Sequence, residues 1–268
     1  MSFIQLGYDD IALAALLLFL NAGLSVALRL GIAQRLLIAG ARMVVQLTLV
    51  GLVLKALFTL TSPWLTGLAA LVMVLFAGRE AMARQERRFT GFWTYGIGTG
   101  SMMAAGIIVT VFALTTQVSP DPWYNPRYAL PILGMILGNT MNGVSIGLDR
   151  LVSGAVTRRA AIEAQLMLGA TAPEALRPVT RDAMRAGLIP TVNGMAAAGL
   201  VSLPGMMTGQ ILAGVEPVEA VKYQILIMFL IGGGTGLGLF TAVMLGRRRL
   251  TDVRHRLRLD RLGAKAKD

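Results

Sequence analysis

The sequence predicts an all-α protein that crosses a membrane about seven times. Of its 268 residues, 55% are hydrophobic and only 15% are charged, with a mean hydropathy of +0.65. Soluble domains contain about 45–50% apolar and roughly 25% charged residues. The apolar residues form repeated runs close to the roughly 20 residues that a helix needs to cross a bilayer. Basic residues gather in alternate connections between these runs. We therefore expect one transmembrane domain over residues 1–268.

The apolar runs and their Gly, Pro and charged interruptions set the order of the expected spans. The third run is the shortest, and a long polar segment separates the fifth run from the sixth. The expected spans cover residues 11–28, 36–60, 63–78, 92–118, 128–151, 188–213 and 220–245.

The distribution of positive charge predicts the orientation. Twenty-one of the 25 Lys and Arg residues lie in alternate connections and in the tail after residue 246. The opposite connections hold Arg127 and Lys222 beside acidic residues. Because basic residues concentrate on the cytoplasmic side, we expect the N-terminus outside and the C-terminus in the cytoplasm. That arrangement requires an odd number of spans.

Composition also narrows the function. The chain has no cysteine, so disulfides and thiolate chemistry are excluded, and its one histidine, His255, lies in the basic tail. The net charge of +11 fits the cytoplasmic face of a membrane protein better than nucleic-acid binding. Arg42 and Lys55 lie near the ends of the second span and can snorkel toward headgroups. No carboxylate lies near the middle of a span, which disfavours a proton- or sodium-driven carrier.

The central polar segment, residues 157–190, predicts a docking element between spans, within a cytoplasmic loop over residues 152–187. Thr157 is expected to cap a first short helix that Gly169 ends. Thr171 and Glu174 form a T-x-x-E capping box that starts a second helix.

The fifth and sixth spans are candidates for a translocation pathway. Polar side chains within a span must find partners in protein or in a wet cavity, and interhelical hydrogen bonding remains an alternative. Glycine and proline in the sixth span predict a kinked or broken helix. The candidate pathway residues are Asn139, Asn142, Ser145, Asp149, Asn193 and Gln210.

Three further patterns have more general interpretations. Glycines four apart in Gly134/Gly138, Gly205/Gly209 and Gly232/Gly236 predict close helix packing. The 15 methionines suit packing better than soft-metal binding, so no metal ligand is assigned. The basic tail over residues 247–268 is expected to contact anionic lipid headgroups.

Four stretches together resemble the FetB-like permeases of ABC transporters, which are associated with iron export and have plant relatives linked to aluminium tolerance. The stretches are RMVVQLTLVGLVL from Arg42, LPILGMILGNTMNGVSIGLDRL from Leu130, EAQLMLGAT from Glu163 and NGMAAAGLVSLPGMMTGQILAG from Asn193.

The central loop is also similar to the EAA loop of ABC importer permeases. Glu163, Ala164 and Gly169 match its E-A-A-x-x-x-G opening, although Gln165 replaces the second alanine. The later I-x-L-P part is missing, because Ile189 and Pro190 lie too far from Gly169.

The resemblance implies the permease subunit of an exporter in the cell inner membrane, with iron or a related metal ion as its cargo. The coupling residues would be Glu163, Ala164, Gly169, Thr171 and Glu174, seated in a separate ABC ATPase. The chain has no Walker-type loop, so ATP and Mg²⁺ would bind to that partner. Two permease copies would form a homodimer.

Two other classes of function remain open from the residues alone. One is a self-contained channel or ion-coupled carrier for a small polar solute, and the other is a membrane scaffold without transport. The iron cargo follows only from the resemblance.

Overall fold

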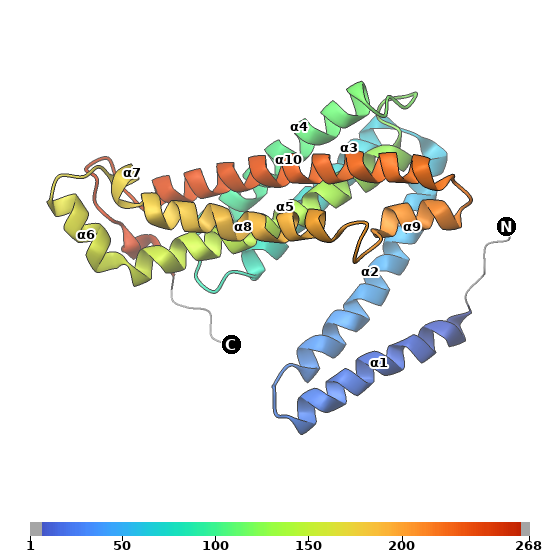
Figure 1. The fold of residues 1–268 in the computed structure, drawn as a ribbon, viewed down its shortest axis with the longest axis horizontal. Helices are drawn as coiled ribbons and strands as arrows, with labels where there is room; N and C mark the ends of the chain where they lie inside the picture. The colour runs from blue at the N-terminus through green and yellow to red at the C-terminus, as the bar shows by residue number, and fades with distance from the viewer. Residues whose placement is uncertain (1–6, 264–268) are drawn as a thin grey trace. The chain divides into compact units, whose positions relative to one another are not determined.

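The computed structural model describes residues 7–263, which form ten α-helices and one short 3-10 helix (Figure 1). The helices are α1 (Tyr8–Ala27), α2 (Ala33–Leu60), α3 (Pro63–Ala83), α4 (Trp93–Thr116), α5 (Pro126–Thr157), α6 (Arg159–Met167), α7 (Ala172–Ala175), α8 (Arg177–Ala197), α9 (Gly205–Leu212), α10 (Pro217–Arg249) and η1 (Leu259–Arg261). No β-strand forms within this range, which confirms the all-α class.

Six of these helices, α1 to α5 and α10, are long and apolar enough to cross a membrane. They match six of the seven expected spans to within a few residues, except that α3 and α5 extend further at their C-terminal ends. The chain is a polytopic α-helical membrane protein. The sixth expected span, residues 188–213, is not one continuous helix, because α8 ends at Ala197 and α9 begins at Gly205.

The predicted break in that segment is confirmed, and it lies beyond Pro190, which α8 contains. The chain leaves helical geometry at residues 198–204, where Gly199 has a φ of +86° that glycine adopts without strain. The Gly199 N–H donates to the Ser202 carbonyl oxygen at 2.9 Å and closes the turn. Pro204 disfavours helix at the residue before it, so α9 starts only at Gly205.

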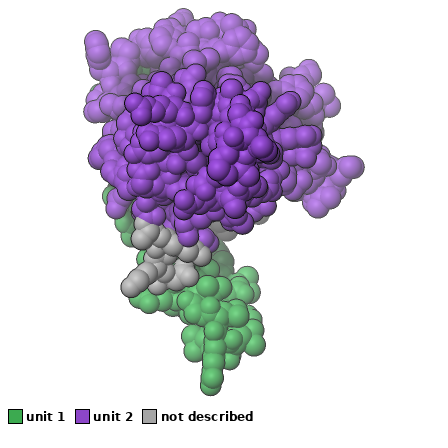
Figure 2. All heavy atoms as spheres, turned by 90° about the vertical axis from the view of Figure 1, so that its left-hand side faces the viewer, with its two compact units in different colours: residues 1–61, 212–214 green, residues 62–211, 215–268 purple. Residues whose placement is uncertain are grey.

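The chain divides into two compact units, which Figure 2 colours separately. The smaller unit comprises residues 1–61 and 212–214 and contains α1 and α2. Only 11% of the most apolar window of α1 and 6% of that of α2 is buried, so their leucine and valine side chains suit a lipid environment. The Ser25 hydroxyl accepts a hydrogen bond from the Ile32 N–H at 3.3 Å, across the turn between the two helices.

The larger unit, residues 62–211 and 215–268, is built around α5. α8 and α10 run along α5 over much of their length (Figure 1), and α3 and α4 also pack against it. Leu148, Leu151 and Val152 of α5 are fully buried against Leu239 and Val243 of α10. One apolar core therefore joins the central helices of this unit.

The backbones of α5 and α8 approach each other closely where two glycines face each other. A Cβ on Gly187 would lie 2.7 Å from the Gly143 carbonyl oxygen, and one on Gly143 would lie 3.0 Å from the Gly187 carbonyl oxygen. The search for glycines four residues apart in the sequence did not identify the contact between Gly143 and Gly187. Four of the six glycines chosen by that spacing, Gly138, Gly205, Gly209 and Gly236, have no neighbouring atom within 4 Å of such a Cβ.

We expect Gly187→Ala to lower the melting temperature of the purified protein in detergent. The new methyl group would press on the Gly143 carbonyl and on Leu239, and overpacking of this kind costs about 1–3 kcal/mol. Gly138→Ala is the matched control, since its methyl group enters open space and should preserve or raise the melting temperature. Equal melting temperatures for the two variants would contradict the close crossing.

Candidate functional site

The first candidate site is the α6–α7 knob, which we define as residues 158–176. In Figure 1, α6 and α7 lie at the end of the bundle formed by α5, α8 and α10. Gly169, with a φ of +92°, ends α6 in the left-handed conformation. The Ala170 N–H donates to the Gln165 carbonyl at 3.0 Å, and the Gly169 N–H donates to the Leu166 carbonyl at 3.1 Å. These paired bonds form a Schellman motif, as the predicted glycine stop requires.

The second turn of the knob starts at the predicted Thr171 and Glu174 pair. The Glu174 carboxylate accepts hydrogen bonds from the Thr171 N–H at 2.8 Å and from the Thr171 hydroxyl at 2.7 Å. The hydroxyl, followed by the backbone N–H, lowers the pKa of Glu174 below 4.5. The stabilisation from this lowered pKa is therefore fully present above about pH 4.5 and is lost as the pH falls through the lowered value.

The prediction that Thr157 caps the first short helix is wrong. Thr157 is the last residue of α5, and the chain enters α6 through Arg158 without a side-chain cap. Core contacts stabilise the last turns of α5, since Val152 and Ala155, shortly before Thr157, are fully buried. Tertiary packing therefore extends the helix past the residue that local sequence marked as a start.

The tip of the knob carries two exposed apolar side chains, Met167 at 83% and Leu168 at 87% exposure. Ala164 is also exposed, whereas Glu163 is half-buried and accepts a hydrogen bond from Arg159 Nε at 2.8 Å. The five predicted coupling residues therefore lie together around this tip.

The base of the knob is held by packing with α5 and α8. Ile162, Ala175 and Leu176 belong to the main core and are almost fully buried. The Arg158 guanidinium pairs with the Asp182 carboxylate of α8 at 2.7 Å, but both groups are exposed and such pairs contribute about 0–1 kcal/mol. Burial rather than charge therefore anchors the knob.

The C-terminal tail also contacts the knob. Over residues 250–263 the tail folds back, with the Arg258 N–H donating to the Leu250 carbonyl and the Thr90 N–H donating to the Arg261 carbonyl, both at 2.8 Å. The Ala172 N–H, at the start of α7, donates to Nδ1 of His255 at 3.2 Å. The Nδ1 atom must carry no proton in order to accept this bond. Ala172 and His255 lie 83 positions apart in the chain, so no local sequence pattern predicts their contact. Residues 264–268 of the expected tail lie outside the described residues.

The second candidate site is a polar pocket of about 640 Å³ between α5, α8 and the end of α3. Arg84 donates to the side-chain oxygen of Asn142, and the Ser145 hydroxyl donates to the Ala81 carbonyl at 3.2 Å. The Glu86 N–H donates to the Asp149 carboxylate at 3.0 Å. The pocket is lined by Arg84, Asn142, Ser145, Ile146, Asp149, Arg150, Asp182, Arg185, Ala186 and Ile189.

Three of the six predicted pathway residues line this pocket: Asn142, Ser145 and Asp149. The other three do not. Asn139 is exposed and donates to the Met135 carbonyl of its own helix at 2.9 Å, while Asn193 and Gln210 lie further along the chain, on α8 and α9.

The lining residues Arg84, Asp182 and Arg185 were missed, because they were assigned to loops. α8 starts at Arg177 rather than near Leu188, so Asp182 and Arg185 are helical. Asp182, Arg185 and Ile189 are separated by three and four residues, so they lie on one face of α8. The same spacing joins Asn142, Ser145 and Asp149 on α5, and this shared pattern was the available signal.

No resident metal site is evident in the described part of the chain. Among residues 7–263, no group of three or more His, Asp or Glu side chains is placed to hold a metal ion. The polar pocket contains three arginines and two aspartates, so it carries charged groups of both signs.

Residues 8–251 match the family described as Uncharacterised protein family (UPF0014). The chain belongs to this family. It is 42% identical to the UPF0014 membrane protein slr1647 of Synechocystis sp. over 75% of this chain and 77% of the relative. It is 34% identical to the probable iron export permease protein FetB of Escherichia coli over 96% of this chain and 97% of the relative.

A plant relative extends the same similarity. The protein ALUMINUM SENSITIVE 3 of Arabidopsis thaliana is 31% identical over 87% of this chain and 84% of its own length. No solved structure matched the chain significantly. Family membership and the six apolar helices together make this UPF0014 protein a multi-pass membrane protein, and the name of its Escherichia coli relative supports a membrane permease.

We expect Thr171→Ala to loosen the second turn of the knob. Removing the hydroxyl takes away one of the two bonds to Glu174, so backbone amides over residues 171–176 should exchange with deuterium roughly fivefold faster, as for loss of a helix cap. Thr157→Ala is the control and should leave exchange over residues 158–163 unchanged. Faster exchange at those amides in Thr157→Ala would restore Thr157 as a cap.

Proposed function

We propose that this chain is the membrane subunit of an ABC exporter and that the α6–α7 knob docks into a separate ATPase subunit. The observation that carries the proposal is the exposed apolar tip of Met167 and Leu168, which a Gly169 turn holds beyond the helix bundle. A short helix with a rigid stop can enter a groove on a partner at a defined angle. The positive-inside pattern favours the cytoplasm for this side of the protein, where such an ATPase would lie.

The connection between the knob and the polar pocket supports a coupling mechanism. The knob joins α5 directly at Arg158 and joins α8 at Leu176, and these two helices form the facing walls of the pocket. Movement of the knob on ATP-driven closure of the partner would therefore be transmitted to both walls. ATP and Mg²⁺ belong to the partner in this proposal, and the chain itself binds no cofactor.

We propose iron or a related metal ion as cargo. The support is the printed name of the Escherichia coli relative, a probable iron export permease, which aligns over nearly the whole chain. Two copies of the permease with two ATPase subunits would complete the transporter, with the wide exposed apolar faces of α1 and α2 available for lipid or for a second copy.

We expect Leu168→Asp to reduce co-purification with the ATPase by roughly tenfold or more, because a charge would be buried at the centre of the interface. Val253→Asp is the matched control, since Val253 is 99% exposed on the tail outside the knob. The measurement is the amount of tagged ATPase retained by each permease variant.

Two further substitutions test the angle and charge of the knob. Gly169→Val should also abolish transport, because a β-branched residue at a φ of +92° is strained by about 1–3 kcal/mol. Glu163→Lys should repel Arg159 and weaken docking. Normal ATPase retention and transport in all three knob variants would remove the knob from the proposed interface.

We expect Asn142→Leu to reduce ATP-driven transport into vesicles by roughly tenfold, because it leaves Arg84 without its amide partner in the pocket. Asn139→Leu is the control on the same helix, since Asn139 bonds only to its own backbone turn and lies outside the pocket. Both variants should assemble with the ATPase. Equal transport by the two variants would show that cargo does not pass the Asn142 side chain.

A further inference from the structure

A second pocket, of about 600 Å³, lies where α4 begins and α10 ends. We call it the Trp93 pocket. Trp93, Gly96 and Ile97 line it from the first turns of α4, while Leu245, Arg248 and Arg249 line it from the last turns of α10. Phe92 and Arg261 complete its lining. All these residues belong to the larger unit, so the pocket is part of one compact body.

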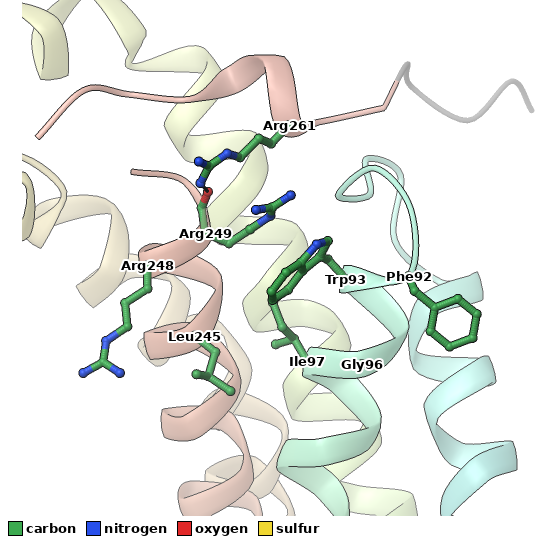
Figure 3. A pocket seen from close by; sticks show the side chains of 8 residues that line it. All are labelled: Phe92, Trp93, Gly96, Ile97, Leu245, Arg248, Arg249 and Arg261. Atoms are coloured by element: carbon green, nitrogen blue, oxygen red, sulfur yellow. Dashed lines mark hydrogen bonds between the residues drawn. The ribbon is translucent and has the colours of Figure 1, made fainter. Parts of the chain in front are cut away.

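One arginine of this pocket lies over an aromatic ring, and another joins the pocket from the tail. The Arg249 guanidinium lies 4.3 Å from the centre of the Trp93 ring, and Figure 3 shows it above that ring with Ile97 and Leu245 below. Arg261 approaches from the tail and donates from Nη1 to the carbonyls of Arg249 at 2.9 Å and Thr251 at 3.1 Å. Backbone hydrogen bonds therefore fix Arg261 without neutralising its charge.

The positive charge of the pocket is balanced only in part by nearby acids, since Asp260 acts electrostatically on Arg261. No Asp or Glu is among the lining residues, and within residues 7–263 neither Arg248 nor Arg249 has a carboxylate partner. The buried Nε of Arg249 also has no hydrogen-bond acceptor in this part of the chain.

The two aspartates in the described part of the tail, Asp252 and Asp260, are held by other arginines. The Arg256 backbone N–H lowers the pKa of Asp252 to about 2, and the Arg258 guanidinium lowers the pKa of Asp260. The Asp252 carboxylate lies 2.8 Å from the Arg256 guanidinium, and the Asp260 carboxylate lies 2.8 Å from the Arg258 guanidinium. Both carboxylates thus remain ionised and paired with arginines other than Arg248 and Arg249, which leaves those two guanidinium groups for an external anion.

The location of the pocket favours a lipid over a soluble anion. α4 and α10 are both membrane-crossing helices, and the pocket lies at their polar ends, where tryptophan and arginine meet headgroups. Phe92 and Trp93 are 79% and 52% exposed, and Leu245 is 39% exposed, so apolar surface continues from the arginines along the two helices. A ligand that fits this arrangement has an anionic head and hydrocarbon chains.

We propose that the Trp93 pocket is a binding site for an anionic phospholipid, with its phosphate held by Arg248, Arg249 and Arg261 and its acyl chains lying along α4 and α10. The ring of Trp93 separates the two parts of the ligand at the level of the glycerol backbone. Such a site differs from diffuse attraction of a basic tail, because it selects the headgroup at one position on the protein.

The test uses Trp93 as a local reporter in the full-length protein. Trp64→Phe and Trp123→Phe leave Trp93 as the single tryptophan, and the protein is placed in phosphatidylcholine nanodiscs. Small equal fractions of phosphatidylglycerol or phosphatidylcholine with brominated chains are then added, since bromine quenches tryptophan on contact. We expect brominated phosphatidylglycerol to quench Trp93 at a lower mole fraction than brominated phosphatidylcholine.

Charge-removing variants identify the residues responsible. Arg248→Gln and Arg249→Gln should each weaken phosphatidylglycerol binding about fivefold, the factor that corresponds to about 1 kcal/mol per basic residue at a membrane surface. Arg254→Gln is the matched control, because Arg254 is exposed on the same tail but lies outside the pocket. Melting temperatures in pure phosphatidylcholine check that the variants fold, and Arg248→Gln alone suffices if Arg249→Gln unfolds.

Three outcomes would overturn the proposal. Equal quenching by the two lipids would mean that the pocket does not select an anionic headgroup. Equal weakening by Arg254→Gln would indicate general surface charge. Displacement of brominated phosphatidylglycerol by millimolar glycerol phosphate would identify a soluble phosphate as the ligand instead of a lipid.

Discussion

The contact between Gly143 and Gly187 sets the geometry of the larger unit. Each residue lies against the backbone carbonyl of the other, so α5 and α8 approach more closely than any side chain at these positions would allow. Dense packing around this crossing transmits small displacements, because a close-packed core has little free volume to absorb them. The polar pocket and the α6–α7 knob both depend on this separation of the two helices.

The polar side chains of the pocket lie on α5 and α8 outside the buried faces that meet at this crossing. Asn142 is adjacent to Gly143, and Asp182 and Arg185 precede Gly187 by five and two residues. Arg84 from the end of α3 closes one side through its bond to Asn142. The pocket is therefore held by three elements, and a shift of α8 along α5 would change the spacing of its charged groups.

The folded tail connects two regions that the sequence presents separately. His255 accepts a hydrogen bond at the start of α7 in the knob, and Arg261 binds the end of α10 beside Trp93. Leu262, which follows Arg261, forms an isolated antiparallel β-bridge with Phe89, shortly before the start of α4. In the proposed transporter, the segment that supports the ATPase-docking knob would also form part of a lipid site, so the two could influence each other through one short peptide.

The sequence by itself determined the all-α class, the six long apolar helices and the Gly169 and Thr171–Glu174 turns. These features depend on local composition, on the length needed to cross a bilayer and on backbone preferences of single residues. The break after α8 was also predicted, since glycine and proline act locally. Asn142, Ser145 and Asp149 were identified as pathway candidates because polar groups in an apolar run are costly without partners.

Only the tertiary structure decided which of these residues meet. Thr157 belongs to α5 because buried neighbours extend that helix, and α8 starts early enough to bring Asp182 and Arg185 to the pocket. The glycine crossing, the His255 contact and the Trp93 pocket join residues 44, 83 and up to 169 positions apart in the chain. Local sequence patterns contain no information about such pairings, because they arise from how helices pack once each has already formed.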